Sequence, residues 1–184
     1  AENSTDYGQD LPEKPGFDTV LNRIGDTLDD SDTWVRMLYT HPKTLTPAVI
    51  EAVTHHSSIC SYYDVPVQHA SSRVLKRMGR PYTRQDLHKL FETIRKTDPD
   101  AALRTTLIVW FPGETEDDFN QLLDFIKTVK FDHMGVFAYS DSNDLTSHQF
   151  KDHVPPEIAQ KRHDILMDVQ AKISESINQA HVGK

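Results

Sequence analysis

The hydrophobic positions change their period along the chain, which indicates alternating helices and strands. Apolar residues recur every three or four positions in six segments, which predicts amphipathic helices. These segments are 17–28, 47–55, 74–78, 83–94, 115–126 and a long one that starts at Pro155 or Pro156 and reaches Ile177. Four segments between them are enriched in β-branched and aromatic residues and are predicted strands: 33–39, 59–67, 102–110 and 134–138.

Capping signals support the predicted helix starts. Thr46 precedes Pro47, which fits an N-cap followed by proline at the first helical position. Thr115 is followed three residues later by Asp118, which resembles a capping box with Asp in place of Glu. Thr83 and Asp86 repeat this spacing, so two helices are expected to begin at boxes of the same kind.

The order of these elements predicts the fold class. Strands that alternate with helices of ten or more residues require a parallel sheet with right-handed crossovers. The sequence therefore predicts an α/β fold with four parallel strands and helices on the outside. A complete barrel has eight strands, so this is either a small open sheet or part of a partial barrel.

Reactive groups in such folds lie at the carboxyl ends of the strands. Four such ends are rich in polar and aromatic residues: 39–42, 67–71, 110–114 and 139–141. The simpler explanation is that strand ends are polar because they are solvated. The segment 111–114 could also present backbone N–H groups to an anion, although a turn before a helix cap is the simpler explanation.

The third predicted strand has two different faces. Strict alternation places Leu103, Leu107 and Val109 on an apolar face that should meet the helices. The opposite face mixes a charge, a hydroxyl and a ring, as expected for a surface that lines a polar ligand; its residues are Arg104, Thr106, Ile108 and Trp110. The alternative for Arg104 is a simple ion pair with a carboxylate such as Asp64.

Composition and charge restrict the class of protein. The 184 residues are 37% hydrophobic, enough for one domain with a core, predicted here over 1–184. The formal net charge of -8 argues against nucleic-acid binding by counterion release. No apolar stretch is long enough for a membrane helix, so we expect a cytoplasmic protein. The only cysteine, Cys60, excludes a disulfide within the chain and is expected inside a strand.

Ten histidines raise the question of a metal site. His41 and His69 follow predicted strands, and together with Glu114 they would suit a metal-dependent barrel hydrolase. Neither histidine has a carboxylate partner that the sequence identifies, and no helical zinc motif is present. A protein-binding module for a basic partner is a third hypothesis.

Several motifs, in order, resemble the radical S-adenosylmethionine (SAM) methylthiotransferases. The matching runs cover most of the chain: Asp64-Val65-Pro66-Val67-Gln68-His69-Ala70-Ser71, Leu103-Arg104-Thr105-Thr106-Leu107-Ile108-Val109, Phe111-Pro112-Gly113-Glu114-Thr115-Glu116 and Gly135-Val136-Phe137-Ala138-Tyr139-Ser140. Within the family, 68–71 and 139–141 resemble the branch that modifies an aspartate of a small-subunit ribosomal protein. The tRNA-modifying branch is the alternative.

The resemblance implies a fold, a reaction and a set of site residues. The fold would be part of a (β/α)6 TIM-like partial barrel, and the reaction would use [4Fe-4S] clusters and S-adenosylmethionine to insert a methylthio group. By resemblance, six residues face the cosubstrate or the peptide: Gln68, Ser71, Arg104, Thr106, Ile108 and Tyr139. The implied partner is the small-subunit ribosomal protein.

Two departures from the family pattern change these expectations. The Cys-x-x-x-Cys-x-x-Cys motif is absent, so the chain is interpreted as a C-terminal part of the barrel core, without the N-terminal cluster domain and the C-terminal TRAM domain. We therefore expect no metal ligands here and no activity from this chain alone. Trp110 stands where the family usually has glycine, and we expect the indole to obstruct the cosubstrate pocket.

Truncation also predicts self-association. Without its preceding strands, the strand predicted at 33–39 would expose a backbone edge and apolar side chains. Such edges pair readily with other chains.

Overall fold

The computed structural model describes residues 3–183, and its chain forms two compact units. The first unit holds the residues up to Pro66 together with Lys89–Arg104, and the second holds Val67–His88 together with the residues from Thr105 onward. Strand β2 (Ala102–Val109) and helix α4 (Arg84–Thr97) contribute to both units. The terminal positions of the predicted 1–184 domain, 1, 2 and 184, lie outside the described residues.

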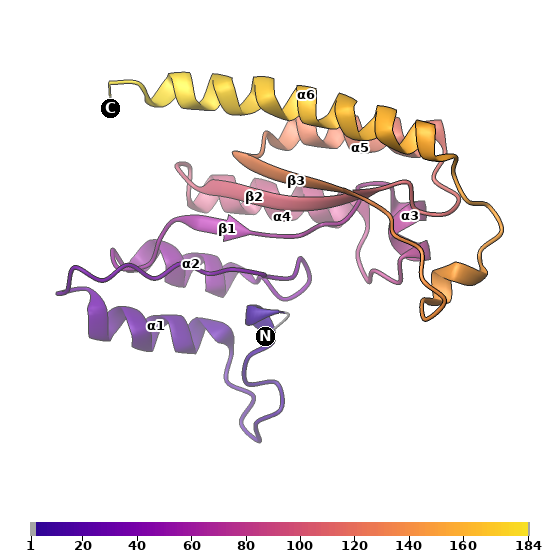
Figure 1. Cartoon of the computed structure of the whole chain (residues 1–184). Coiled ribbons are helices and arrows are strands. Elements are labelled where there is room, and N and C mark those ends of the chain that lie inside the picture. The colour runs from indigo at the N-terminus through magenta and orange to yellow at the C-terminus, as the bar shows by residue number, and fades with distance from the viewer. Residues whose placement is uncertain (1–2, 184) are drawn as a thin grey trace. The chain divides into compact units, whose positions relative to one another are not determined.

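The first unit contains two helices that pack side by side, α1 (Phe17–Leu28) and α2 (Pro47–His55) (Figure 1). A short 3-10 helix, η1 (Ser4–Asp6), precedes them. The hydroxyl of Thr46 accepts a hydrogen bond from the N–H of Val49, and Pro47 occupies the first turn. The predicted start of this helix is therefore confirmed.

The first unit also contains the parallel pairing between β1 (Tyr62–Asp64) and the start of β2. Tyr62 lies opposite Ala102, and Asp64 lies opposite Arg104. The strand predicted at 59–67 is thus shorter than expected, and Cys60 lies just before it, partly buried.

The strand predicted at 33–39 is not formed, and this is a correction to the sequence analysis. Only one isolated parallel bridge, between Val35 and Ile59, represents it. At its end Tyr39 is left-handed (φ 56°), and the N–H groups of Tyr39 and Thr40 donate to the side chain and the carbonyl of Asp64. These bonds replace a regular ladder. The described residues therefore form three strands instead of the predicted four, in the order β1-β2-β3.

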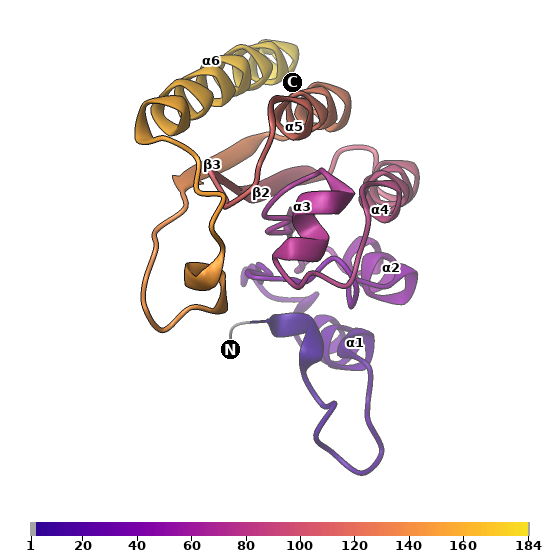
Figure 2. The same ribbon diagram turned by 90° about the vertical axis from the view of Figure 1, so that its right-hand side faces the viewer.

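In the second unit, β3 (His133–Ala138) lies beside β2 and is covered by a long helix, α6 (Pro156–His181). Helix α5 (Glu116–Val129) packs beside α6, as Figure 2 shows. The unit also contains α3 (Ser72–Arg77) and a short 3-10 helix, η2 (Thr146–Gln149), in the loop after β3.

Both predicted capping boxes are present. In α5, the Thr115 hydroxyl accepts from the N–H of Asp118, and the Asp118 carboxylate accepts from the N–H of Thr115 at 2.8 Å. In α4, the N–H of Thr83 donates to Asp86 at 2.8 Å, and the N–H of Asp86 donates back to the threonine hydroxyl at 3.3 Å. Aspartate therefore fills the role that glutamate usually has in this motif.

The alternation along β2 is confirmed. Leu103, Thr105, Leu107 and Val109 are fully buried, and the alternate residues Arg104, Thr106 and Ile108 are only partly buried. Pleating accounts for this pattern, because successive side chains point to opposite faces. One face of β2 is thus left available for a ligand or for polar contacts.

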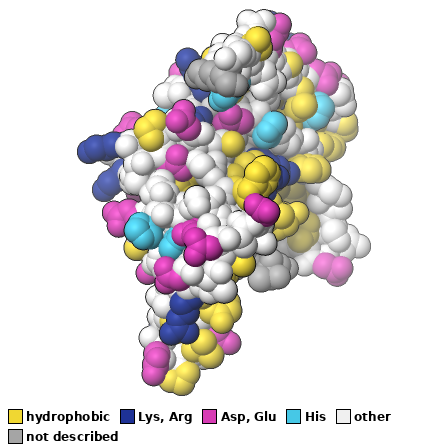
Figure 3. All heavy atoms as spheres, turned by 90° about the vertical axis from the view of Figure 1, so that its left-hand side faces the viewer, with side chains coloured by type: hydrophobic (Ala, Val, Ile, Leu, Met, Phe, Trp, Pro, Cys, Tyr) yellow, Lys and Arg dark blue, Asp and Glu magenta, His cyan; other side chains and the backbone are white. Residues whose placement is uncertain are grey.

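The surface mixes charges of both signs. On the face in Figure 3, basic and acidic side chains are interspersed, with histidines among them. Among residues 3–183, no helix is long and apolar enough to cross a lipid bilayer.

Candidate functional site

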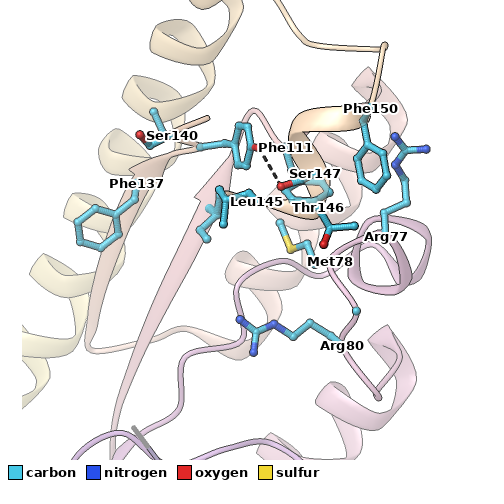
Figure 4. Close-up of a pocket in the computed structure, with 14 residues that line it drawn as sticks. Arg77, Met78, Arg80, Phe111, Phe137, Ser140, Leu145, Thr146, Ser147 and Phe150 are labelled. Carbon is cyan, nitrogen blue, oxygen red and sulfur yellow. Dashed lines mark hydrogen bonds between the residues drawn. The ribbon is translucent and has the colours of Figure 1, made fainter. Parts of the chain in front are cut away.

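A cavity of about 730 Å³ lies in the second unit at the ends of β2 and β3. Its wall comes from the C-terminal end of α3, from Ile108 of β2, from the end of β3 and from the loop that contains η2. Figure 4 shows aromatic and aliphatic side chains around it, with Phe137 and Phe150 on different elements. This volume is within the range of small-molecule sites.

Two of the six predicted site residues line this cavity. They are Ile108 and Tyr139. The Tyr139 hydroxyl donates to the Asp141 carboxylate at 3.0 Å and lies 2.8 Å from the Ser147 hydroxyl, so the loop is tied to the end of β3 (Figure 4). Burial raises the pKa of Tyr139, the hydrogen bond with Ser147 lowers it, and Asp141 raises it again.

Gln68 lies alongside β2, next to Thr106. The N–H of Gln68 donates to the Thr106 carbonyl at 2.9 Å, and the N–H of Ile108 donates to the Gln68 carbonyl at 2.7 Å. Gln68 itself is left-handed, with φ 66°. These bonds bring Gln68, Thr106 and Ile108 together on consecutive rungs, although the cavity wall includes only Ile108 of the three.

Ser71 is buried and holds other protein groups. Its hydroxyl caps α3 at the N–H of Val74 and donates to the Asp118 carboxylate at 2.5 Å. Arg73 also forms an ion pair with Asp118. Burial alone would raise the pKa of Asp118, but the hydrogen bonds from Arg73, Ser71 and Thr115 outweigh it and keep this pKa below its ordinary value.

Arg104 lies in the first unit, where it pairs with Asp64. The two side chains are 2.7 Å apart between Nη1 and Oδ1. The hydrogen bond with Asp64 raises the pKa of Arg104, and burial opposes that shift. The simple ion pair that the sequence analysis considered for Arg104 is therefore present.

A buried ion pair between Arg162 and Glu114 lies at the turn that follows β2. Arg162 of α6 donates to Glu114 Oε1 at 2.8 Å, and the N–H of Trp110 donates to the other carboxylate oxygen at 2.6 Å. Burial raises the pKa of Glu114, while Arg162 and the N–H groups of Trp110 and Phe111 oppose the shift. This pair anchors α6 to the turn that follows β2.

His69 is fully buried next to this pair. Its Nδ1 accepts the N–H of Ser71 at 2.9 Å, and its Nε2 lies 3.9 Å from Glu114 without a hydrogen-bond partner. Burial lowers the pKa of His69 to about 3. The ring is therefore neutral near pH 7, with its proton on Nε2.

Trp110 does not fill the cavity. Its indole N–H donates to the carbonyl of Val154, and the ring is not among the groups that line the wall. The residue is left-handed, with φ 72°, and this turns the side chain out of the alternation of β2. Trp110 therefore does not obstruct this cavity, and its obstruction of the cosubstrate pocket stays a prediction.

The metal-site hypothesis is wrong. Among residues 3–183, no group of three or more His, Cys, Asp or Glu side chains could hold a metal ion. His69 and Glu114 lie together but are buried, and His41 belongs to the other unit.

Sequence reasoning missed two arginines that shape this region. Arg162 follows Ile158 by four residues and precedes Ile165 by three, so its place on the apolar side of the last helix was a readable signal. Arg80 lines the cavity, and it sits in a loop where no periodicity marks it.

The comparisons with known protein families and with curated proteins agree on one family. The model of the radical SAM superfamily matches residues 15–126, more than half of the chain. The ribosomal protein uS12 methylthiotransferase RimO of Desulfosudis oleivorans is 51% identical over 174 residues, covering 95% of this chain and 39% of that protein. Its namesake in Clostridioides difficile is 43% identical over 184 residues, which is 100% of this chain and 41% of that one.

Among solved structures, coproporphyrinogen III oxidase (HemN) of Escherichia coli aligns with a TM-score of 0.65 and 16% identity. The alignment covers 90% of this chain and 38% of that one, and it supports the fold alone. The α/β fold class and the partial-barrel resemblance are thereby confirmed, with three strands where four were predicted. The chain spans about two fifths of the length of the curated relatives it matches. It belongs to the radical SAM superfamily.

Proposed function

We propose that this chain is part of the barrel core of a methylthiotransferase that modifies an aspartate of ribosomal protein uS12. The observation that carries the proposal is the 51% identity, over 95% of the chain, to a protein of that name. Because the chain corresponds to about two fifths of its relatives, the activity is proposed for a whole protein and not for this part alone.

The ribosomal branch is favoured over the tRNA branch. The segments Gln68-His69-Ala70-Ser71 and Tyr139-Ser140-Asp141 resemble the ribosomal branch, and they lie at the strand ends of the second unit. The relatives named above carry the ribosomal-protein name. We infer that uS12 is the macromolecular partner.

The chain's own residues are proposed to bind the cosubstrate and the peptide. Ile108 and Tyr139 would contact S-adenosylmethionine or peptide directly, because they line the cavity. Gln68 and Thr106 would contact the same ligands beside Ile108, because backbone hydrogen bonds hold these three residues together. Ser71 and Arg104 are also proposed site residues by resemblance, although their polar groups are already engaged by Asp118 and Asp64 and Arg104 belongs to the first unit.

The residues present do not fit a [4Fe-4S] cluster. Such clusters are held by several thiolates, and this chain contains one cysteine. We therefore propose that the cluster is held by residues other than those of this chain, and that this chain alone is inactive. Anaerobic reconstitution with iron and sulfide should give no cluster absorbance and no turnover of S-adenosylmethionine; either signal would contradict this.

A deletion strain tests the proposed function. We expect the mass of uS12 from the source organism to show a methylthio group, to lose it when the gene that encodes this chain is deleted, and to regain it on complementation. Modified nucleosides of tRNA from the same strains serve as the control. If uS12 keeps its modification while a tRNA nucleoside loses one, the tRNA branch is the correct assignment.

We also propose that this chain self-associates through the segment 33–39. Its side chains Trp34, Leu38 and Tyr39 are exposed, and one backbone edge of Val35 is already used by Ser58 and Cys60. The apolar side chains at this position support association with another copy.

A further inference from the structure

Strand β3 has one side that no other described strand occupies, because it stands last in the strand order β1-β2-β3. Just after β3, the N–H of Tyr139 donates to the Val109 carbonyl of β2 at 2.9 Å. The backbone groups of successive residues point to opposite sides of a strand. Those of Gly135 and Phe137 therefore face β2 in the same way as those of Tyr139.

The other backbone groups of β3 form its outer edge, which consists of the N–H and C=O groups of Met134, Val136 and Ala138. Just before the strand, the carbonyl of Asp132 accepts a hydrogen bond from the hydroxyl of Ser174 in α6 at 2.8 Å. Beyond that point, no hydrogen bond from another segment reaches the outer edge among residues 3–183. Edges of this kind pair readily with an extended chain.

The two faces of β3 differ in what covers them. The side chains of Met134 and Val136 are buried, and α6 packs against the strand. His133 and Phe137 are exposed on the opposite face, with Gly135 between them. A β-carbon added to Gly135 would find only the Phe137 ring within 4 Å among the described residues, apart from its chain neighbours. This face therefore has room for side chains from another segment.

The cavity of the second unit lies at the end of this strand, where Phe137, Ala138 and Tyr139 line it (Figure 4). A side chain within a polypeptide can enter a cavity only if the main chain has a path on both sides of it. A strand added at the outer edge would follow such a path, and every second side chain of it would lie on the face of Gly135 and Phe137.

We propose that the outer edge of β3 binds an extended segment of the ribosomal protein by strand addition, with the aspartate that is modified on the face of Phe137. This inference rests on the proposed function, since the segment comes from uS12. A second copy of this chain could pair with the same edge, and the experiment separates the two occupants.

Amide hydrogen exchange in ¹⁵N-labelled chain measures this edge residue by residue. Without ligand, we expect the N–H groups of Gly135 and Phe137 to be protected and those of Met134, Val136 and Ala138 to exchange faster. The probe is a synthetic peptide of about ten residues, the length of a long strand, centred on the uS12 aspartate. At saturation it should slow exchange at the outer edge about tenfold or more and leave the inner amides unchanged.

Two N-methylated peptides with the same side chains are the matched controls. Each carries methyl groups on alternate backbone nitrogens, so that one set of N–H donors is removed and the other is kept. We expect one of them to bind at least about tenfold more weakly than the unmodified peptide, and the other to bind about equally well, since only one set of donors faces the edge.

Ala138→Pro tests the same edge from the side of the chain. Proline removes one outer N–H at a position where an edge strand tolerates it, so peptide affinity should fall about tenfold while thermal melts establish that the variant is folded. Ala138→Ser keeps the N–H and should lose less affinity than the proline variant.

Equal affinities of the two N-methylated peptides, or peptide binding without slowed exchange at the outer edge, would assign recognition to side chains and overturn the inference. No binding of the peptide would overturn it as well. Slowed exchange that grows with chain concentration in the absence of peptide would assign the edge to a second copy and overturn it too. In each of these cases the uS12 mass measurement still decides the proposed function separately.

Discussion

The guanidinium of Arg104 and the carboxylate of Asp64 meet at 2.7 Å across two adjacent parallel strands, where the two residues stand opposite each other in register. The Asp64 side chain is 2% exposed and also accepts the N–H of Tyr39, whereas Arg104 keeps about a third of its surface in solvent. The pair thus neutralises a buried carboxylate with a partly exposed cation.

Replacing Arg104 with Ala should destabilise the chain, because it leaves the buried Asp64 carboxylate without its cation. We expect the free energy of unfolding to fall by about 2 kcal/mol, measured by urea denaturation. Asp64→Asn combined with Arg104→Gln should recover part of this loss, because no uncompensated charge remains. A change below about 0.5 kcal/mol in Arg104→Ala would mean that water replaces the cation without cost.

Local signals predicted most of the fold correctly. The helix starts at Thr46 and Thr115 are confirmed because capping depends on residues close in sequence. The buried face of β2 follows from pleating alone. The failure at 33–39 has a long-range cause, since Asp64 takes the backbone N–H groups of Tyr39 and Thr40. No pattern within 33–39 contains that information.

The candidate site was only partly predictable for the same reason. Alternation placed Arg104, Thr106 and Ile108 on one face of β2, and the structure agrees. The direction of Trp110 depends on its left-handed backbone, which periodicity does not reveal in a residue other than glycine. Arg80 lines the cavity from an irregular turn, so its place there depends on the three-dimensional fold and not on a local pattern.

His69 predicts a specific loss of stability in acid. Its pKa is lowered to about 3 in the folded chain, below the ordinary value of 6.5, so the unfolded chain binds a proton between these values and the folded chain does not. Stability from this group is complete above pH 6.5 and falls as the pH drops toward 3. The slope should be about 1.4 kcal/mol per pH unit.

Urea denaturation between pH 7 and 4 measures this slope. His69→Asn keeps an acceptor for the N–H of Ser71 but does not titrate, so its slope should be smaller than that of the wild type by about one proton. His55→Asn, at an exposed histidine, is the control. Parallel curves for the wild type and His69→Asn would show that His69 does not titrate as described.

The left-handed backbone at Trp110 predicts that the glycine variant of this position is more stable than the alanine variant. Both substitutions remove the indole and its hydrogen bond to Val154, but only alanine retains the cost of a side chain at φ 72°. Trp110→Gly should therefore be more stable than Trp110→Ala by about 1 kcal/mol. Thermal melts of the two variants measure the difference. If the alanine variant is the more stable, the backbone has left the left-handed region.

The proposed self-association would depend on an exposed ring in the segment 33–39. Trp34 has 82% of its surface exposed, and Leu38 and Tyr39 beside it are about half exposed. Burying this indole against a second copy would favour association, since aromatic groups dominate interface energies. We expect static light scattering to report a mass above 21.0 kDa that rises with concentration.

Trp34→Ser should return this mass to the monomer value, whereas Val182→Ser, at an equally exposed position near the C-terminus, should not. A monomer mass for the wild type at every concentration would refute the association, and equal loss in both variants would place the contact elsewhere.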